Sequence, residues 1–262
     1  MKQTKPDYGN WVPLAMMRTL AVVMAVLLSG TVLLLILLPT PIPGSLLGAL
    51  LAALLIFWLY MLRCRHLFDF NRGGLMGKFH QYLVDHLDWG GNGTLLDIGC
   101  GSGALTIRCA KAFPQARLTG IDYWSAEWSY AKEQCERNAA VEGVFDRVTF
   151  QKGDAAHLAF PDGAFDAVVS NFVFHEVRPE KDKRKVVREA LRVLKKGGAF
   201  ALQDLFARPK LYGDMEQFAE ELRREGFQEV RYIPNVEKLG FVHGYAQSPW
   251  MLSGVGLLYG KK

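Results

Sequence analysis

The 262-residue chain has few cysteines, no internal repeat and no low-complexity segment. Its four cysteines form neither a Cys-x-x-Cys pair nor a cysteine–histidine cluster with zinc spacing, so the sequence indicates reduced thiols and no metal site. The net charge of +5 is modest, and the basic residues form no stripe of the kind that binds nucleic acid. A chain of this length therefore has room for one α/β domain and one further element.

The largest absence is of charge, because residues 19–62 contain no Asp, Glu, Lys, Arg or His. Two apolar runs, 19–38 and 42–62, fill this stretch. Each is long enough to span, as a helix, roughly 30 Å, the thickness of a bilayer core. Prolines at positions 39, 41 and 43 separate the runs by a turn that is short enough to enforce an antiparallel hairpin. We therefore predict a transmembrane hairpin in region 1–67, followed by a second domain at 68–262.

Two alternatives to this hairpin are a cleaved signal peptide and a hairpin that is buried or lies on the membrane surface. A signal peptide is followed by a soluble segment, whereas here a second apolar run follows almost at once. Basic residues flank both runs and are absent from the turn; they are Lys2, Lys5, Arg18, Arg63, Arg65 and Arg72. By the positive-inside rule, we expect a protein integral to the cell membrane, with the lipid bilayer as a partner and with its N-terminus and second domain in the cytoplasm.

We expect the segment 95–103 to form the centre of the second domain. Its first residues are apolar enough for a strand buried on both faces of a parallel sheet, and a helix-like run opens at Ala104. Between them lie Gly99, Gly101 and Gly103. Glycines let the backbone approach a ligand closely, and a helix N-terminus offers unpaired N–H groups. The pattern of strand, glycine turn and helix therefore favours a nucleoside-bearing cofactor.

The glycines alone do not identify that cofactor. The spacing Gly-x-Gly-x-x-Ala over 99–104, with Asp122 downstream, also satisfies the dinucleotide fingerprint, so an NAD(P)-dependent oxidoreductase is one alternative. Asp97, however, lies inside the strand end, where dinucleotide folds usually carry an apolar residue. The pattern Asp-Ile-Gly-x-Gly-x-Gly over 97–103 resembles motif I of the class I S-adenosylmethionine (SAM) methyltransferases.

The resemblance extends over residues 68–262 and implies a fold, a cofactor and several roles. It implies an α/β, Rossmann-like, seven-stranded sheet with helices on both faces, in which the final strand is antiparallel between the fifth and the sixth. It implies SAM as the cofactor, with the carboxylate of Asp154 accepting from the adenine amino group and the backbone N–H of Ala155 beside it. A turn aspartate is the alternative interpretation of Asp154. The expected strands are 95–98, 116–122, 148–150, 166–172, 199–204, 230–233 and 254–259, with a turn at 195–198 before the fifth.

Three further residues of the expected cofactor site lie at strand ends. Asp122 ends the second strand, where a carboxylate can accept both ribose hydroxyls. Tyr123 follows it and can lie against the adenine face. Asn171 ends the fourth strand at the same edge of the sheet as the glycine turn, which predicts a place beside the methionine part of the cofactor. Asp97 and the three glycines complete the predicted site.

His175 and Glu176 follow Asn171 at the mouth of the expected site. A histidine suits a general base because its ordinary pKa is near neutrality, so His175 is the leading candidate, with Glu176 and His243 next. A polar residue at a strand-end turn, without a catalytic role, is the alternative. The sulfonium of SAM is an activated leaving group, so a base is needed only where the acceptor must lose a proton.

The hairpin predicts the class of acceptor. A membrane anchor makes most sense for an acceptor in the bilayer, so we expect a small lipophilic molecule such as a lipid or a quinone, and neither protein nor nucleic acid. The aromatic-rich segment 239–252 either lines the acceptor pocket, touches lipid or packs on its own domain. The alternatives to such an enzyme are a SAM-binding membrane scaffold or sensor without turnover, and the oxidoreductase named above.

Overall fold

The computed structural model describes residues 5–37, 42–124 and 132–262. The chain forms two compact units: residues 9–77 make up one, and residues 5–8 together with 78–262 make up the other. The second unit therefore includes a short piece that precedes the apolar helices in the sequence. The division after residue 67, which composition favours, stays a prediction.

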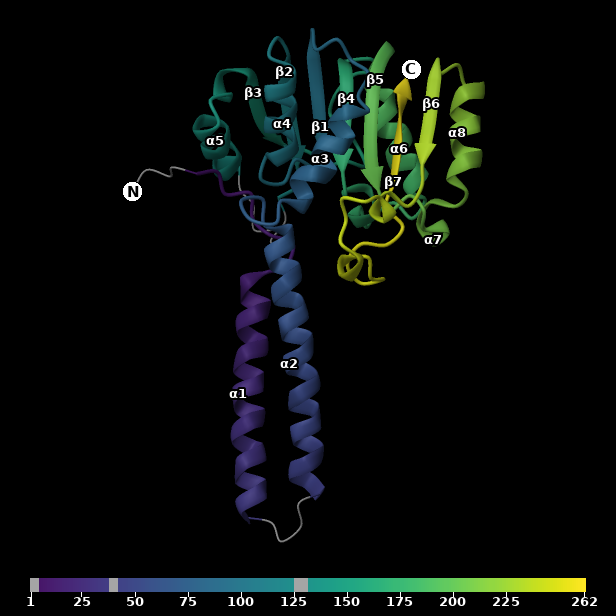
Figure 1. The fold of residues 1–262 in the computed structure, drawn as a ribbon. Coiled ribbons are helices and arrows are strands. Elements are labelled where there is room, and N and C mark those ends of the chain that lie inside the picture. The colour runs from purple at the N-terminus through teal and green to yellow at the C-terminus, as the bar shows by residue number, and fades with distance from the viewer. Residues whose placement is uncertain (1–4, 38–41, 125–131) are drawn as a thin grey trace. The chain divides into compact units, whose positions relative to one another are not determined.

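Two long helices make up most of the first unit and run side by side (Figure 1): α1 spans Leu14–Leu37 and α2 spans Ile42–Phe68. Both are long and apolar enough to cross a membrane: an 18-residue stretch within Leu14–Leu37 has a mean hydropathy of 2.9, and one within Gly44–Phe68 has a mean hydropathy of 2.3. Helix α1 begins before the first predicted run and α2 ends after the second, because no helix breaker lies in residues 14–18 or 63–68. The indole N–H of Trp58 donates to the carbonyl of Met17 at 3.1 Å and joins the two helices.

The outer faces of both helices are apolar and exposed. Ile36 of α1 is 73% exposed and Ile56 of α2 is 69% exposed. A large exposed apolar surface is unusual for a water-soluble protein and marks a place where a membrane or another protein binds.

Seven strands of the second unit form one sheet, in the order β3-β2-β1-β4-β5-β7-β6 (Figure 1). The pairs among β1 to β5 are parallel, whereas β7 is antiparallel to both β5 and β6. The predicted sheet is thereby confirmed, including the antiparallel final strand between the fifth and the sixth. The strands are β1 Thr94–Ile98, β2 Arg117–Asp122, β3 Val148–Lys152, β4 Phe165–Asn171, β5 Leu194–Asp204, β6 Glu229–Ile233 and β7 Gly256–Lys261.

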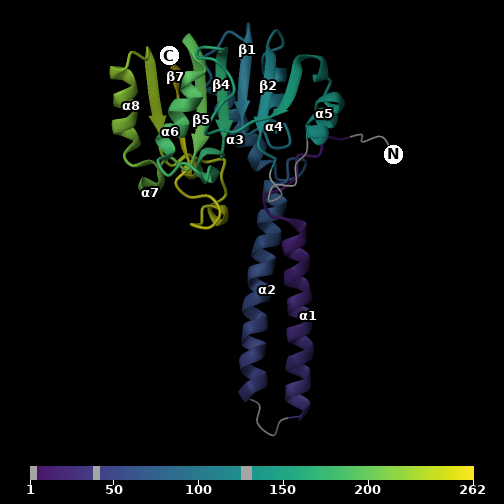
Figure 2. The ribbon, with the colours of Figure 1, turned by 180° about the vertical axis from the view of Figure 1, so that it is seen from behind.

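Helices cover both faces of this sheet, with α3 over the face seen in Figure 1 and α6 over the opposite face, seen in Figure 2. Aspartates cap two of them: the carboxylates of Asp182 and Asp214 accept from backbone N–H groups in the first turns of α6 and α8 and stabilise those turns. The helices are α3 Leu75–Asp85, α4 Ala104–Ala112, α5 Lys132–Val141, α6 Lys183–Arg192, α7 Pro209–Tyr212 and α8 Met215–Arg224.

The structure corrects the prediction of a turn at 195–198. Strand β5 begins at Leu194, so these residues already belong to the strand. Leu194 pairs with Phe165 and Ala199 pairs with Ala167, and this unequal spacing is a bulge that takes up the extra residues. Gly197 and Gly198 therefore lie in a bulge of β5 and not in a turn before it. The bulge arises from the pairing of β5 with β4, which the local sequence does not indicate.

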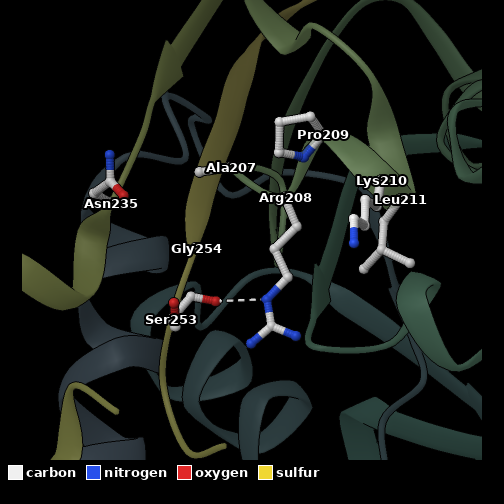
Figure 3. Close-up of a pocket in the computed structure, with 8 residues that line it drawn as sticks. All are labelled: Ala207, Arg208, Pro209, Lys210, Leu211, Asn235, Ser253 and Gly254. Carbon is white, nitrogen blue, oxygen red and sulfur yellow. Dashed lines mark hydrogen bonds between the residues drawn. The ribbon is translucent and has the colours of Figure 1, made fainter. Parts of the chain in front are cut away.

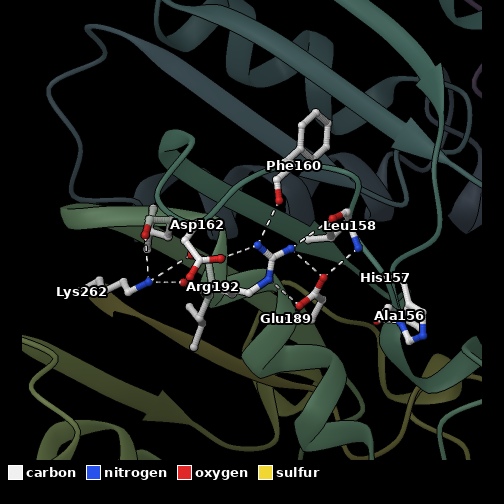
Figure 4. A network of polar contacts seen from close by, with 10 residues as sticks. Ala156, His157, Leu158, Phe160, Asp162, Glu189, Arg192 and Lys262 are labelled. Atoms are coloured by element: carbon white, nitrogen blue, oxygen red, sulfur yellow. Dashed lines mark hydrogen bonds and ion pairs between the residues drawn. The ribbon is translucent and has the colours of Figure 1, made fainter.

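A polar network around Arg192 fixes the loop after β3 to helix α6 (Figure 4). The guanidinium donates to the carbonyl of Leu158 at 3.1 Å and to that of Phe160 at 3.0 Å. It also pairs with the carboxylates of Glu189 and Asp162. Oε1 of Glu189 also accepts from the N–H of Leu158 at 2.8 Å, so two side chains of α6 hold the backbone of this loop.

Candidate active site

The glycine turn between β1 and α4 takes a conformation that needs glycine. Gly99, Gly101 and Gly103 have φ angles of 74°, 56° and 83°, in the left-handed region that side chains disfavour. At Gly99 an added Cβ would collide with a methyl carbon of Val173, which follows β4. The turn therefore runs close against the segment that leaves the fourth strand.

Asp97 lies near the end of β1 and is buried, with 1% exposure. Its Oδ2 accepts a 2.5 Å hydrogen bond from the hydroxyl of Thr106 in α4, and its Oδ1 has no partner among the residues that the structure describes. Burial, with a smaller contribution from the charge of Asp122, raises the pKa of Asp97 to about 7 against the lowering effect of its hydrogen bond with Thr106. A buried oxygen without a partner is costly, so we expect a donor or a cation to pair with it when the site is filled.

The carboxylate of Asp122 is held at the glycine turn by two backbone N–H groups. Oδ2 accepts from Gly101 at 2.9 Å, and Oδ1 accepts from Trp124 at 2.8 Å. The indole N–H of Trp124 donates in turn to the carbonyl of Gly101 at 3.0 Å. Each carboxylate oxygen has a second lone pair, so both can also accept from a ribose hydroxyl. The end of β2 and the glycine turn thus form one site.

Tyr123 follows Asp122 and is 61% exposed. The ammonium group of Lys152 lies 5.0 Å from the centre of its ring, at the distance of a cation–π contact. The contact with adenine that the sequence favours for Tyr123 stays a prediction.

Asp154 and Ala155 lie in a turn after β3. Oδ1 of Asp154 accepts from the N–H of Ala156 at 2.8 Å, which makes an Asx turn. The N–H of the neighbouring Gly153 donates to the carbonyl of Asp122 at 3.0 Å and brings this turn to the end of β2. The structure therefore gives Asp154 a turn geometry beside the site, and its adenine role stays a prediction.

Asn171 ends β4 and is tied to β5. Its Oδ1 accepts a 2.7 Å hydrogen bond from the side-chain amide of the buried Gln203. The next residue, Phe172, has a φ of 57°, which is uncommon outside glycine. The chain thus turns sharply as it leaves the strand, toward the segment that carries His175.

His175 lies in a single 3₁₀ turn after β4 and pairs with Asp204, the last residue of β5. Its Nδ1 is 2.7 Å from Oδ1 of Asp204, and its Nε2 is 3.3 Å from a carboxylate oxygen of Glu176. Asp204 is fully buried, and its Oδ2 accepts from the backbone N–H groups of Val173 at 2.9 Å and Phe174 at 2.8 Å. The Asp204 carboxylate therefore fixes both the imidazole and the backbone that carries it.

These neighbours set the charge behaviour of His175. Burial lowers its pKa, but the hydrogen bond and charge of Asp204, with the charge of Glu176, outweigh burial and raise the pKa above its usual value. The positive charge of Arg208 acts in the opposite sense. Because Asp204 accepts at Nδ1, the neutral ring presents Nε2 as its proton acceptor.

Asp204 is a site residue that was not predicted from the sequence. The available signal is an acid that ends an otherwise apolar strand, the same signal that marks Asp97 and Asp122. The pairing of Asp204 with His175, 29 residues earlier, was not predictable in this way because it depends on β4 and β5 being neighbours.

An aromatic cluster lies beside the turn after β4. Phe79 of α3 packs edge-on against Phe172, with 5.7 Å between ring centres, and against Phe241, with 5.2 Å. Tyr82 adds a contact of 5.7 Å with Phe241. This part of segment 239–252 therefore packs on its own domain.

The rest of segment 239–252 is more open. Trp250 is 72% exposed and Tyr245 is 43% exposed. His243 is exposed and stacks on Tyr245 at 5.7 Å. In contrast to His175, it has no carboxylate partner among the described residues, and its rank as a base stays a prediction.

A cavity of about 510 Å³ opens after β5 (Figure 3). Nε of Arg208 lies there, 2.9 Å from the carbonyl of Ser253. Because the charge of Arg208 acts on His175, the cavity lies within electrostatic range of the His175–Asp204 pair. The lining residues are Ala207, Arg208, Pro209, Lys210, Leu211, Asn235, Ser253 and Gly254, and none of them belongs to the predicted cofactor site.

Comparison with known proteins identifies the family. Residues 96–202, from β1 into β5, match the family model described as a methyltransferase domain. The chain carries a class I SAM-dependent methyltransferase domain. SAM is the cofactor of this family, which confirms the cofactor predicted from the motif. The matched residues include Asp97, Asp122 and His175.

Two curated relatives extend this match. The 27-O-demethylrifamycin SV methyltransferase of Amycolatopsis mediterranei (strain S699) is 39% identical over 135 residues, which cover 50% of this chain and 45% of that protein. The arsenite methyltransferase of Aquipseudomonas alcaligenes is 33% identical over 155 residues, which cover 58% of this chain and 43% of that protein. The chain thus matches less than half the length of these relatives.

A solved structure shows the fold of the methyltransferase domain. The crystal structure of the [4+2]-cyclase SpnF superposes with a TM-score of 0.53 at 22% identity, covering 71% of this chain and 80% of that one. Similarity at this identity is a similarity of fold. Since that neighbour is named as a cyclase, the fold alone does not give the reaction, and the activity has to be inferred from the site.

Proposed function

We propose that this chain is a membrane-anchored methyltransferase that transfers the methyl group of SAM to a small lipophilic acceptor. The observation that carries the proposal is Oδ1 of Asp97, a buried carboxylate oxygen that has no partner in the described part of the chain. It lies in β1 just before the glycine turn of a methyltransferase domain. The methionine part of SAM carries a sulfonium and an ammonium group, and a cationic donor suits such an oxygen.

The proposed cofactor residues divide along the cofactor. Asp97 and Asn171 hold the methionine part, Asp122 holds the ribose hydroxyls, and Tyr123 with the turn at 154–155 holds adenine. The three glycines let the backbone approach closely. When bound, SAM supplies a methyl group on a leaving group that needs no further activation, so the protein has mainly to align the acceptor and exclude water.

His175 is the proposed general base. Asp204 accepts the Nδ1–H and orients the ring, so Nε2 is the atom that removes a proton from an acceptor hydroxyl or amine as the acceptor attacks. The same carboxylate stabilises the imidazolium that results. Glu176 contributes its negative charge beside Nε2, and its more exposed side chain makes it the weaker base candidate.

We predict that SAM affinity rises with pH up to about 7. The pKa of Asp97 is raised to about 7, so at about pH 6 this carboxyl is mostly protonated. A cationic ligand favours the ionised form, so binding below pH 7 must release a proton, and affinity should fall by up to about tenfold per pH unit.

Calorimetric titration with SAM at about pH 6 and about pH 8, in two buffers of different ionisation enthalpy, measures that proton release. In an Asp97→Asn variant the pH dependence should disappear. Binding of SAM at the lower pH without proton release would contradict the pairing of Asp97 with the cofactor.

The proposed acceptor is small and lipophilic. The apolar faces of α1 and α2 favour a membrane anchor, and an anchor benefits an enzyme whose acceptor lies in the bilayer. The cavity of about 510 Å³ beside Arg208 has the size of a small-molecule site. With basic residues flanking the hairpin, the domain faces the cytoplasm, where SAM is present.

Replacing residues 14–62 by a flexible glycine–serine linker tests the lipophilic acceptor. The replacement keeps residues 5–8, which belong to the same compact unit as the methyltransferase domain. We expect the variant to bind SAM as the parent does but to lose most labelled-methyl transfer into vesicles made from a total lipid extract. If the variant methylates a water-soluble fraction at the rate of the full-length protein, the hairpin serves only to localise the enzyme, and the prediction of a lipophilic acceptor is wrong.

A SAM-binding scaffold or sensor is the second candidate. The solved neighbour named as a cyclase favours keeping it, because this fold also occurs in a protein that is not named as a methyltransferase. Binding of SAM without any labelled-methyl transfer would favour this candidate over the enzyme.

A further inference from the structure

Two residues at the start of the chain, Asp7 and Tyr8, form the N-terminal strap of the second unit. Asn138 of α5, fully buried, clamps the backbone of Asp7: Oδ1 accepts from the Asp7 N–H at 2.9 Å and Nδ2 donates to the Asp7 carbonyl at 2.7 Å. Gln134, one turn earlier in α5, donates to the same carbonyl at 2.6 Å. The strap is therefore bound through its backbone by a buried amide.

The strap also reaches the glycine turn directly. Ser102, between Gly101 and Gly103, donates from its hydroxyl to the carbonyl of Tyr8 at 2.9 Å. Nδ2 of Asn138 donates to the carbonyl of Ser102 at 3.0 Å in addition to its bond with the strap. One buried amide and one buried hydroxyl thus join the strap to the turn that the proposed function assigns to the cofactor.

The strap adds to the hydrogen bonds that hold the turn at Gly101, which come from Asp122 and Trp124. Gly101 and Gly103 adopt the left-handed backbone conformation. Glycine allows this conformation but also allows others, so contacts around the turn must select it. Without the strap, the polar atoms of Asn138 and the hydroxyl of Ser102 would lose partners inside the protein, and buried groups without partners are costly. The turn is then expected to rearrange to satisfy them.

We propose that the N-terminal strap is a positioning element for the cofactor turn, so that the segment leading into the first apolar helix helps to set SAM affinity. This rests on the proposed function of the glycine turn. From Tyr8 the chain continues through residues 9–13 into α1. The same short peptide therefore connects the apolar hairpin to the cofactor site along the chain.

Thermodynamic linkage predicts two measurable effects, one on SAM binding and one on the strap. If the strap holds the turn in the form that binds SAM, then SAM must hold the strap by the same factor. Loss of one strap bond should weaken SAM binding, and SAM should slow hydrogen exchange of the Asp7 amide, which donates to Asn138.

A matched pair of substitutions at position 7 tests whether the strap affects SAM binding. Asp7→Pro removes the backbone N–H that donates to Asn138, whereas Asp7→Ala keeps it. In full-length protein in detergent, we expect Asp7→Pro to raise the Kd for SAM by about three- to tenfold, and Asp7→Ala to leave it within about twofold. Ser102→Ala, which removes only the hydroxyl donor to Tyr8, should raise the Kd in the same sense.

Thermal unfolding of the same variants separates positioning from plain stability. A lower melting temperature with an unchanged Kd in both Asp7→Pro and Ser102→Ala would overturn the proposal, as would exchange of the Asp7 amide that SAM leaves unchanged. If Asp7→Pro does not fold, Ser102→Ala and the exchange measurement decide. If the parent itself binds no SAM, both the proposed function and the role proposed for the strap are wrong. If the parent and both variants bind SAM with the same Kd, only the role proposed for the strap is wrong.

Discussion

Replacement of His175 by alanine is expected to lower the rate of methyl transfer by roughly 10²–10⁴-fold while the Kd for SAM changes little. The reason is that Nε2 of His175 is the proposed proton acceptor, whereas the residues proposed to bind SAM lie at the glycine turn, at the ends of β1, β2 and β4 and in the turn after β3. The measurement is labelled-methyl transfer from SAM into a lipid extract, with SAM binding followed by calorimetry on the same preparations. Glu176→Gln is the matched control and should retain most activity.

The pH profile adds a test of the His175–Asp204 pair. The base must be neutral, and its pKa is raised above the usual histidine value, so activity should rise with pH through a midpoint above about 6.5. Asp204→Asn removes the charge that raises this pKa and should move the midpoint to lower pH while slowing the reaction. If His175→Ala keeps the parent rate and profile, the acceptor needs no base and the role of His175 is wrong.

Replacement of Asp122 by alanine is expected to raise the Kd for SAM by roughly 10- to 100-fold. Hydrogen bonds to a charged group contribute about 1.5–3 kcal/mol each, and the carboxylate is proposed to accept from the ribose. It also accepts from the N–H groups of Gly101 and Trp124, so its loss loosens the turn itself. Calorimetric titration of the parent and the variant measures the change.

Two further variants sharpen that experiment. Gly101→Val should be worse than Asp122→Ala, because a β-branched residue is strained at a φ of 56° and its side chain would occupy space at the cofactor turn. Asp162→Asn, at an exposed carboxylate outside the site, should bind SAM like the parent. If Asp122→Ala and Gly101→Val also bind like the parent, the pocket is misplaced.

The sheet was predictable because each of its strands has a local signature. Apolar runs of strand length that end in a polar residue or a glycine turn identified β1, β2 and β4, and the motif around Asp97 indicated the family and with it the antiparallel place of β7. The start of β5 was not predictable, because Lys195–Gly198 have turn composition and form a bulge only because Leu194 and Ala199 on either side pair with β4.

The candidate site was predictable in part for a similar reason. Strand ends meet at one edge of a parallel sheet, so Asp97, Asp122 and Asn171 could be assigned to one region from sequence alone. The partner of His175, Asp204, could not be assigned from sequence alone, because it lies on β5 and His175 follows β4. The contact of Asp7 with Asn138 joins residues 131 positions apart, and no local pattern marks it.

Transfer of a labelled methyl group from SAM into a membrane extract, catalysed by the full-length protein, tests the central claim most directly. We expect label in a small, solvent-extractable lipophilic product, with at least about a hundredfold less formed per unit time by His175→Ala, and with a higher SAM concentration needed for the same rate by Asp122→Ala. Absence of any transfer by protein that binds SAM would contradict the claim of an enzyme, and tight binding of NAD(H) in place of SAM would contradict the assignment of the site itself.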